Sequence, residues 1–419
     1  MISAKASGPM ALVLAFAIAG AFAGGSACAQ DAPSGRHEIR PADLPPPFAT
    51  PSVSNAPDIV RRTAAMALRV PAGYHANLFA EGLEHARWLA VAESGEVFLA
   101  EPQLGKVTLL VDSDGDGRAD KRSTFVRGLD MPHGLALRGG YLYVADLDGI
   151  WRYSWRPGQE RATRRGERIT PVGAFGDSGG VHWTRNIAIA PDGKRIYVAI
   201  GSEGNVEVDP DPRATIMQFN IDGSGGRVFA RGLRNPVGIA FHPETGVLYT
   251  TVNERDGLGD GLVPDYLTAV TEGAFYGWPY AYIGPHPQPD LGGRRPDLVR
   301  QTVVPDVLFQ SHSAPMALLF AKGGQFPASW QDDAFVAFRG SWNAATPTGY
   351  KIVRVPFEKG RPLGWYEDFV TGFRVDAPGA KAAAQVWGRP VGLALAKDGS
   401  LLIAVDVDNS IWRVSRAQP

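Results

Sequence analysis

The sequence has almost no cysteine, no strong charge of either sign and none of the common nucleotide- or haem-binding motifs. Its single cysteine, Cys28, excludes an internal disulfide. The chain has no CxxCH motif for a c-type haem and no GxGxxG turn between a strand and a helix, which argues against a nicotinamide-binding fold. A formal net charge of −1 predicts no basic face for nucleic acid. A small neutral or modestly charged substrate fits better.

Turn-forming residues are abundant instead. The 419 residues include 50 Gly and 33 Pro, while a charged fraction of 20% and ten Trp indicate a folded rather than a disordered chain. Apolar segments alternate with a period near two or run continuously, as buried strands do. This excludes an α-solenoid, whose repeats need a helical period.

The first residues have the pattern of an export signal. Lys5 precedes an apolar stretch over residues 10–22, and small residues lead to Ala29 before Gln30. We expect cleavage after Ala29 and a periplasmic or secreted mature chain. The apolar stretch is short for a membrane span, so we expect no transmembrane segment in the mature protein. A lipid anchor through Cys28 and a buried N-terminal helix are the alternatives.

Three regions follow from this pattern. Residues 1–29 are predicted to be a signal peptide. Residues 30–60 are rich in Pro, Ala and Ser and are predicted to be a tether. Residues 61–417 are predicted to form one folded domain.

One unit recurs along this domain. It consists of a strand ending in a Phe-x-x-Gly-Leu-like corner, a loop, an apolar strand of the type Gly-Leu-Ala-Leu, a Gly turn and a second apolar strand. Clear copies are LFAEGLEHARWLAVAESGEVFLAE, TFVRGLDMPHGLALRGGYLYVAD, VFARGLRNPVGIAFHPETGVLYTTV and VWGRPVGLALAKDGSLLIAVD, and two further copies, beginning HWTRN and HSAPM, are more diverged. Their spacing of roughly 45 to 80 residues matches the four-stranded blade of a β-propeller. The fold class is therefore all-β, a six-bladed propeller of four-stranded antiparallel blades.

The ends of the chain predict how the ring closes. The strand from Tyr74 to Leu83 has no preceding blade, and the last blade, which ends at residues 411–414, lacks an outer strand. Pairing these two closes the ring and removes an open sheet edge.

The blade register sorts polar residues by face. Loops that lead into the innermost strands, and loops that join the second strand to the third, lie together at the mouth of the central channel. These loops carry His133, the segment His182 to Asn186, Ser202 to Asn205, Arg234-Asn235-Pro236, Asn253 to Asp256, His312 to Pro315, Gly340 to Asn343 and Trp387 to Pro390. Imidazoles, guanidiniums, amides and an indole on one concave face suit a planar anionic ligand. His242 falls on the opposite face and is assigned no role.

Each of these groups also has a purely structural interpretation. A single His at the start of an inner strand often serves packing, Arg-Asn-Pro can brace neighbouring blades, and Trp342 can belong to the core. The convergence of several such groups on one face favours the functional interpretation.

A separate acidic loop runs from residue 111 to 120. Asp112, Asp114, Asp116 and Asp120 have the near-alternating spacing of an oxygen-ligand calcium loop, with a Gly after the third. Ser123 stands where such loops usually carry a bidentate Glu. A structural calcium site and a plain Asp/Gly turn are both open, and a catalytic role is not expected because the loop faces away from the mouth.

Several segments together resemble the glucose/sorbosone (aldose) sugar dehydrogenases that depend on pyrroloquinoline quinone (PQQ), over about residues 69–414. They are GLRNPVGIAFHPETGVLY, NERDGLGDGLVPDYLTAV with FYGWPYAYIG, HSAPMALLF, FRGSWNAATPTGYKIVRVPF and VWGRPVGLALAKDGSLLIAVD. The resemblance is closer to the sorbosone-type branch. It implies a six-bladed propeller that binds PQQ and Ca²⁺ at the channel mouth and oxidises a sugar, sugar aldehyde or related alcohol.

The resemblance also implies roles for individual residues. His182 would be the general base that takes the hydroxyl proton while hydride passes to the quinone, and Arg234 and Asn235 would stabilise the resulting negative charge. The remaining implied roles are cofactor binding by Glu203, Asn253, Trp342 and Arg389, substrate binding by Asp265, and calcium ligation by the backbone carbonyls of Glu254 and Arg255.

Some positions depart from the family pattern. Trp387 replaces a second basic residue of the glucose-oxidising branch, Val181 replaces an acidic one, and Glu203 stands where an amide is common. These departures make the glucose-oxidising branch the poorer match.

Two other function classes compete with this one. A calcium-dependent propeller hydrolase or lactonase would hold its metal with side-chain carboxylates, and a non-catalytic carbohydrate-binding propeller would need no cofactor. If the chain is a dehydrogenase, electrons must pass to an external acceptor, a cytochrome or the quinone pool, because the chain carries no haem.

Overall fold

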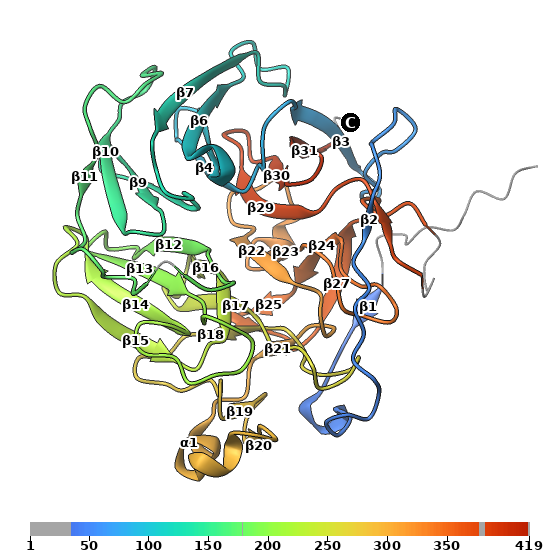
Figure 1. The fold of residues 1–419 in the computed structure, drawn as a ribbon. Coiled ribbons are helices and arrows are strands. Elements are labelled where there is room, and N and C mark those ends of the chain that lie inside the picture. Colours follow the sequence, from blue (N-terminus) through green and yellow to red (C-terminus); the bar gives the residue numbers. More distant parts are fainter. Residues whose placement is uncertain (1–34, 178, 377–381, 418–419) are drawn as a thin grey trace, which may run out of the picture.

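Strands make up nearly all regular structure in the part of the chain that the computed structural model describes, residues 35–177, 179–376 and 382–417. Six antiparallel sheets are arranged in a ring; five have four strands, and the sixth has four blade strands with β1 added at its edge, so the predicted six-bladed propeller is confirmed (Figure 1). The innermost strands, β4, β8, β12, β16, β22 and β29, contact one another in this order, and β29 contacts β4.

The first three blades follow the chain directly. The first contains β4 (Trp88–Val91), β5 (Val97–Glu101), β6 (Lys106–Val111) and β7 (Lys121–Arg127). The second contains β8 (Gly134–Arg138), β9 (Tyr141–Ala145), β10 (Ile150–Ser154) and β11 (Glu167–Arg168). The third contains β12 (Arg185–Ile189), β13 (Arg195–Ile200), β14 (Thr215–Asn220) and β15 (Arg227–Arg231).

The remaining blades carry the insertions. The fourth contains β16 (Asn235–Phe241), β17 (Leu248–Asn253), β18 (Tyr266–Ala269) and β21 (Val307–Leu308). The fifth contains β22 (Pro315–Phe320), β23 (Ala334–Phe338), β24 (Lys351–Val355) and β27 (Tyr366–Val370). The sixth contains β29 (Pro390–Leu395), β30 (Leu401–Val405), β31 (Ser410–Arg416) and β3 (Tyr74–Ala80).

Short helices and strands lie in the segments that connect the blade strands. The insertion between β18 and β21 holds β19 (Ala281–Tyr282), β20 (His286–Pro287), the 3₁₀ turn Gly292–Arg294 and the one α-helix of the described residues, α1 (Pro296–Gln301). Others are β25 (Phe357–Glu358), β26 (Arg361–Pro362), β28 (Gln385–Val386) and the 3₁₀ turns Pro102–Leu104 and Ala328–Trp330. Among the described residues, no helix is long and apolar enough to cross a membrane.

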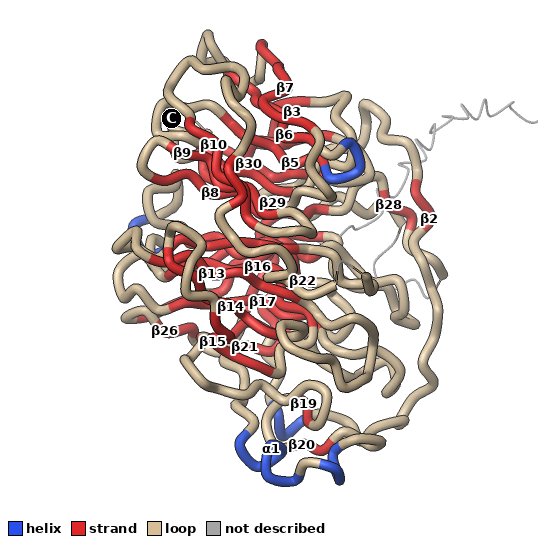
Figure 2. The backbone as a smooth tube through the Cα atoms, turned by 60° about the vertical axis from the view of Figure 1, so that its left-hand side comes forward, coloured by secondary structure: helices blue, strands red, loops and turns tan. Residues whose placement is uncertain are grey.

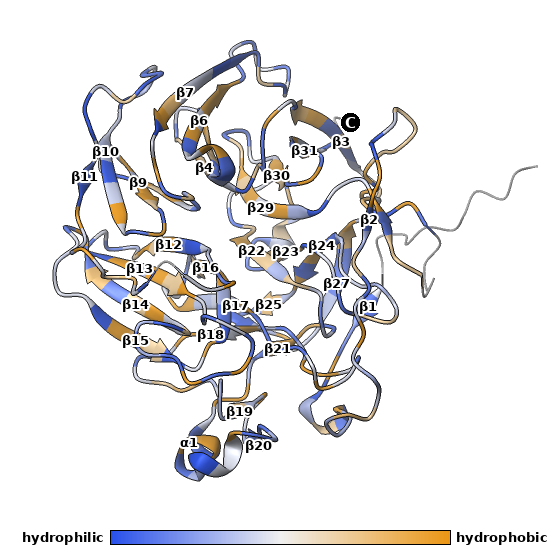
Figure 3. Ribbon diagram, viewed as in Figure 1, coloured by the Kyte–Doolittle hydropathy of each residue, from blue (hydrophilic) through white to orange (hydrophobic). Residues whose placement is uncertain are grey.

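The second strand of a blade is covered on both faces. Every residue of β5, β23 and β30 is buried, because neighbouring blades pack against both sides of the sheet. This accounts for the continuous apolar runs VFLA, AFVAF and LLIAV. Figure 3 shows the hydrophobic colouring concentrated along the strands.

The glycine of the Gly-Leu-Ala-Leu repeat allows adjacent inner strands to approach closely. A Cβ on Gly134 would lie 2.4 Å from the Arg185 carbonyl oxygen of the next blade, and a Cβ on Gly392 would lie 2.2 Å from that of Arg87. No side chain fits between these strands. The repeat signature therefore reflects the packing around the channel.

The predicted ring closure is also confirmed. β3 pairs antiparallel with β31, from Tyr74 opposite Arg416 to Ala80 opposite Ile411. The strand ends at Ala80, earlier than the predicted Leu83, since the register shifts after Leu78 and Gly82 adopts a left-handed φ of 65°.

The chain from Gly35 to residue 60, within the predicted tether, lies against the propeller. β1 (Arg36–His37) pairs with β27, and β2 (Asp58–Ile59) pairs in parallel with β28. Between them lies the 3₁₀ turn Pro41–Asp43. Figure 2 shows β2 beside β28 at one side of the molecule. The predicted export signal and Cys28 lie outside the described residues.

Candidate active site

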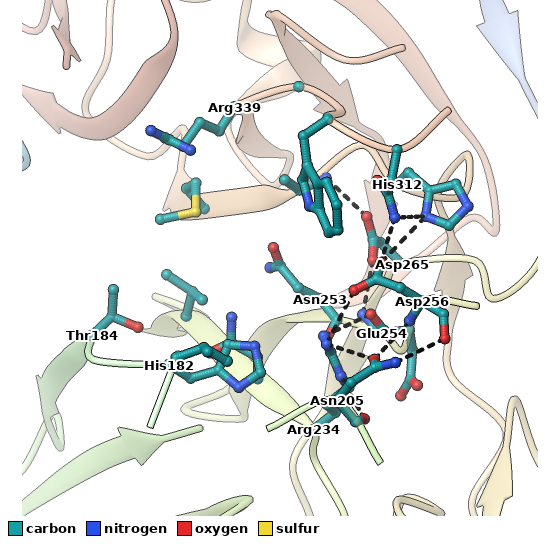
Figure 4. A pocket seen from close by; sticks show the side chains of 18 of the residues that line it. His182, Thr184, Asn205, Arg234, Asn253, Glu254, Asp256, Asp265, His312 and Arg339 are labelled. Carbon is teal, nitrogen blue, oxygen red and sulfur yellow. Dashed lines mark hydrogen bonds and ion pairs between the residues drawn. The ribbon is translucent and has the colours of Figure 1, made fainter. Parts of the chain in front are cut away.

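A cavity of about 530 Å³ opens at the mouth of the channel. It is lined from the loops that the blade register assigned to this face, by His182, Arg234, Asn235, Asn253, Glu254, Asp265, Trp342 and Arg389 among the predicted site residues. Other lining residues include Arg87, Trp183, Thr184, Asn205, Asp256, His312, Arg339 and Asn343. Figure 4 shows His182 and Thr184 on one side, Arg339 on another, and a hydrogen-bonded network from Arg234 to His312.

His182 is held as a neutral base. Its Nδ1 lies 3.0 Å from both the carbonyl oxygen and Oγ of Ser202. Because a carbonyl can only accept, Nδ1 carries the proton and Nε2 keeps its lone pair. Burial, with the nearby charge of Arg234, lowers the pKa of His182 to about 3. The imidazole is therefore unprotonated at neutral pH in the cofactor-free protein.

Arg234 is fully engaged by the protein. Its Nε and Nη2 donate to the backbone and side-chain oxygens of Asn205, at 3.2 and 3.0 Å, and Nη2 also lies 3.3 Å from Asp256 Oδ2. Its Nη1 donates to the carbonyl oxygens of Asn253 and Glu254, at 3.2 and 2.7 Å. All five N–H groups therefore have acceptors. Arg234 acts on a ligand through its charge, not through a spare donor.

Three carboxylates form an acidic wall, which we define as Glu254, Asp256 and Asp265. Burial raises the pKa of both Glu254 and Asp265 to about 7, although Arg234 opposes this for Glu254 and two backbone N–H groups oppose it for Asp265. Asp256 instead has a lowered pKa, because hydrogen bonds from His312 and Asn343 and the charge of Arg234 outweigh its burial. The wall thus holds one carboxylate that stays ionised and two whose pKa lies at about 7, so that each of these is partly protonated at neutral pH.

His312 connects this wall to neighbouring loops. Its Nε2 lies 3.3 Å from the Gly259 carbonyl oxygen, and its Nδ1 lies 3.1 Å from Asn343 Nδ2 and 3.6 Å from Asp256 Oδ1. The backbones of His312 and Ala314 have left-handed φ values of 67° and 54°. Such strain in non-glycine residues is typical of functional loops.

Three guanidiniums form a basic wall, which we define as Arg87, Arg339 and Arg389. Asp406 Oδ2 accepts from Arg87 and from Arg339, each at 2.7 Å, while Arg389 donates to the carbonyl oxygens of residues 339 and 340. Burial, with neighbouring positive charge, lowers the pKa of Arg87 and of Arg389 to about 10, so both remain charged. One carboxylate against three guanidiniums leaves an excess of positive charge that suits an anionic ligand.

Two indoles line the same cavity. Trp342 is 50% exposed. Trp183 is held by the ring of His133, at 5.3 Å between centroids, and by Arg87, 5.1 Å from its ring. His133, which the sequence placed at the mouth, is fully buried and bonds Asn186, so it supports Trp183 and takes no part in lining the cavity.

Several buried polar atoms of the cavity lack a partner among the described residues. They are Arg87 Nε, Thr184 Oγ1, Asn235 Oδ1 and Glu254 Oε1. Because an unpaired buried polar group costs about 1–3 kcal/mol, such atoms are expected where a ligand supplies the partner. A planar molecule with carboxylates and carbonyls, as PQQ is, fits Arg87 Nε, the Thr184 hydroxyl and the basic wall. Asn235 Oδ1 and Glu254 Oε1 are acceptors, which a hydroxyl group or a metal ion would pair.

Other predicted site residues lie outside the cavity. Glu203 points to Arg213, 3.7 Å away, and Arg255 donates to the Asp256 carbonyl oxygen and to Gln288. Trp387 is buried against Phe373 in the core. The Glu254 carbonyl, a predicted calcium ligand, already accepts a hydrogen bond from Arg234.

The acidic loop of the first blade lies away from the mouth, as predicted. Oxygen atoms of Asp112, Asp114 and Asp116 lie within 4.8 Å of one another. Asp120 instead accepts hydrogen bonds from the backbone and hydroxyl of Ser113, and Asp112 accepts from Gly115 and Gly117. These bonds satisfy a turn without a metal, so calcium here stays a prediction. On the same face, buried His242 pairs with Asp332 at 2.8 Å.

Sequence reasoning did not single out Arg87 or Asp406. Both obey the rule that identified the others: Arg87 precedes the innermost strand of the first blade, and Asp406 follows the second strand of the last. Asp256, His312 and Asn343 were placed at the mouth but given no role. Their mutual contacts join loops of two blades, which no local motif encodes.

The sequence of this chain is similar to one protein family and to several known proteins. A family model described as TrAA12-like matches residues 68–263 and 298–417. An uncharacterised protein of Borreliella burgdorferi is 27% identical over 359 residues, which cover 83% of this chain and 90% of that protein. A pyrroloquinoline quinone-dependent pyranose dehydrogenase of Coprinopsis cinerea is 23% identical over 397 residues, covering 80% of this chain and 53% of that protein, so the chain spans about half its length.

A solved structure supports the fold. The holo form of the pyranose dehydrogenase PQQ domain from Coprinopsis cinerea superimposes with a TM-score of 0.70 and 21% identity, covering 86% of this chain and 99% of that domain. At this identity the likeness concerns the fold alone.

Proposed function

Since this chain belongs to the TrAA12-like family, we propose that it is a PQQ-dependent oxidoreductase that dehydrogenates a sugar or a related alcohol or aldehyde. The Coprinopsis cinerea relative is named as a PQQ-dependent pyranose dehydrogenase, which supports the cofactor and the substrate class. The observation that carries the proposal is the pairing of a basic wall with a neutral histidine base across one cavity.

The basic wall would hold the cofactor. Arg87, Arg339 and Arg389 supply the charge for its carboxylates, and half-exposed Trp342 offers a flat apolar surface. When bound, PQQ supplies a quinone that accepts the hydride of the substrate carbon. An anion beside these guanidiniums would also relieve their mutual repulsion.

His182 would act as the general base. Its Nε2 lone pair takes the proton of the substrate hydroxyl, while the Ser202 carbonyl retains the Nδ1 proton and fixes the ring. A pKa of about 3 is low for a base at neutral pH, and an anion bound in the cavity would raise it by offsetting Arg234. Arg234 would stabilise developing negative charge through its field, and Asn235 Oδ1, which has no partner among the described residues, would accept a hydrogen bond from the ligand.

The acidic wall would serve substrate and calcium. Asp265 would bind the substrate, as the family resemblance implies. Calcium would lie near the carbonyls of Glu254 and Arg255, where the unpartnered Glu254 Oε1 adds negative charge. Because the Glu254 carbonyl accepts from Arg234, calcium must share or displace that hydrogen bond. We also retain export from the cytoplasm and an external electron acceptor as proposals.

The carboxylates do not favour the hydrolase alternative. Asp256 is paired with Arg234, and both oxygens of Asp265 accept backbone N–H groups, from Glu254 at 2.8 Å and Ala314 at 2.9 Å. A hydrolytic metal site needs several carboxylate oxygens that converge on the ion, and in the acidic wall only Glu254 Oε1 lacks a partner within the described part of the chain.

Reconstitution tests the proposal. Purified protein is loaded with PQQ and Ca²⁺, and reduction of an artificial dye is followed with a panel of aldoses, alcohols and aldehydes. We expect dye reduction that requires PQQ. His182→Asn keeps a donor for the Ser202 carbonyl but lacks the base, so it should bind PQQ normally and turn over about 10² to 10⁴ times more slowly. Sugar-lactone hydrolysis without PQQ, or no PQQ binding, would contradict the proposal.

A further inference from the structure

The N-terminal segment contacts two loops of the candidate active site. We define residues 45–55 as the strap. It lies outside the family match, which begins at residue 68. β1 holds the chain on one side of the strap to β27, and β2 holds the other side to β28, so the strap is fixed at both ends.

The strap first braces the loop that carries the acidic wall. The Phe48 amide donates to the Leu258 carbonyl at 2.7 Å. The amides of Gly259 and Asp260 donate to the hydroxyls of Ser52 and Thr50, at 3.0 and 2.8 Å. Two amides at the tip of this loop thus depend on strap side chains.

This tip is joined to the cavity. The Gly259 carbonyl is the partner of His312 Nε2, and Asp260 Oδ1 accepts from the Ala345 amide at 2.5 Å. A Cβ on Gly259 would lie 2.8 Å from the Thr50 carbonyl oxygen, so the strap and the loop tip pack with no side chain between them. A shift of the strap is thereby transmitted to His312 and to the acidic wall.

The strap also anchors the loop that carries Trp342. The Asn55 amide donates to the Trp342 carbonyl at 2.7 Å, and its side-chain Nδ2 donates to the Ala344 carbonyl at 2.9 Å. These bonds flank Trp342 and Asn343. They hold the backbone that carries the half-exposed Trp342 indole.

We propose that the strap is a positioning element of the active site, and that Thr50, Ser52 and Asn55 are positioning residues for cofactor and substrate. They set the acidic wall, His312 and Trp342 relative to the rigid inner strands. This inference rests on the proposed function. The strap would explain how the loop that carries the acidic wall and the loop that carries Trp342, which belong to different blades, keep fixed positions around one cavity.

The test compares a paired set of variants. Thr50→Val with Ser52→Ala removes both hydroxyl acceptors, whereas Thr50→Ser with Ser52→Thr retains them. Amide hydrogen exchange on the cofactor-free protein should become faster in peptides containing residues 259 and 260 only in the first variant. Loss of two hydrogen bonds should also weaken PQQ binding about tenfold and raise KM more than it lowers kcat. Asn55→Ala should give the same signature, with faster exchange around residues 342–345.

Three outcomes decide the proposal. Unchanged exchange in the first variant would overturn it. Faster exchange with unchanged PQQ affinity and KM would show a purely structural strap and would also overturn it. Since exchange is measured without cofactor, a wild-type chain that binds no PQQ removes the proposed function, while the exchange result still reports whether the strap positions the loops.

Discussion

Gly201, directly after β13, determines how closely His182 and Asn235 approach each other. A Cβ at this position would lie 2.6 Å from both the Cβ of His182 and Oδ1 of Asn235. Ordinary contacts are about 3.5–4.0 Å, so in Gly201→Ala both side chains must move by about 1 Å. Ser202, which holds the His182 ring, is the next residue. A displacement of this size at a catalytic base costs about 10²-fold in rate, and overpacking costs about 1–3 kcal/mol of stability.

The assay is steady-state dye reduction with saturating PQQ, together with thermal unfolding. Gly201→Ala should lose about 10²-fold in kcat while it still binds PQQ. Gly293→Ala is the matched control, because a Cβ there meets no atom within 4 Å and it should behave as wild type. Wild-type kcat in a folded Gly201→Ala protein would refute the argument that close packing at this glycine positions the base.

Two further predictions concern charge. Arg389→Ala removes a partner for a carboxylate that is already ionised in the ground state, so PQQ binding should weaken about 10- to 100-fold and activity should recover with excess PQQ; a lowered kcat at saturation would contradict this. His182 has a folded-state pKa of about 3, whereas the unfolded chain binds this proton near pH 6.5, so its stabilising contribution is lost as the pH falls from about 6.5 towards 3. The free energy of unfolding of the cofactor-free protein, measured with urea, should therefore fall between pH 7 and pH 4 by about 1–3 kcal/mol less in His182→Asn than in the wild type. If both proteins lose the same free energy of unfolding, the imidazole is exposed to water and the argument is wrong.

The repeat pattern predicts which residues lie at the mouth of the channel, but it does not predict their contacts. Alignment of the repeat copies with one another is enough to place Arg234, Asn253 and Arg389 on one face, because each stands at a fixed place relative to an apolar strand. The same register did not reveal that all donors of Arg234 would be used by neighbouring loops. Those loops differ between blades, so their conformations are not repeated and no pattern predicts them.

For Glu203 the repeat pattern predicts the position of the loop but not the direction of the side chain. Its place in the loop after β13 is correct, yet its side chain turns towards Arg213 and away from the cavity. Side-chain direction in an irregular loop depends on what packs beside it, and the strand period does not extend there.

The sequence by itself determined the six blades, the closure by β3 and the face that carries the site, because strand period, turn residues and the inner-strand glycine repeat every blade. Only the tertiary structure decided which charges meet across the cavity. The basic wall around Asp406, the acidic wall with His312 and the strap over both loops join residues from distant parts of the chain. Their contacts arise when the ring closes and brings non-repeating loops together, and this step leaves no local signal in the order of residues.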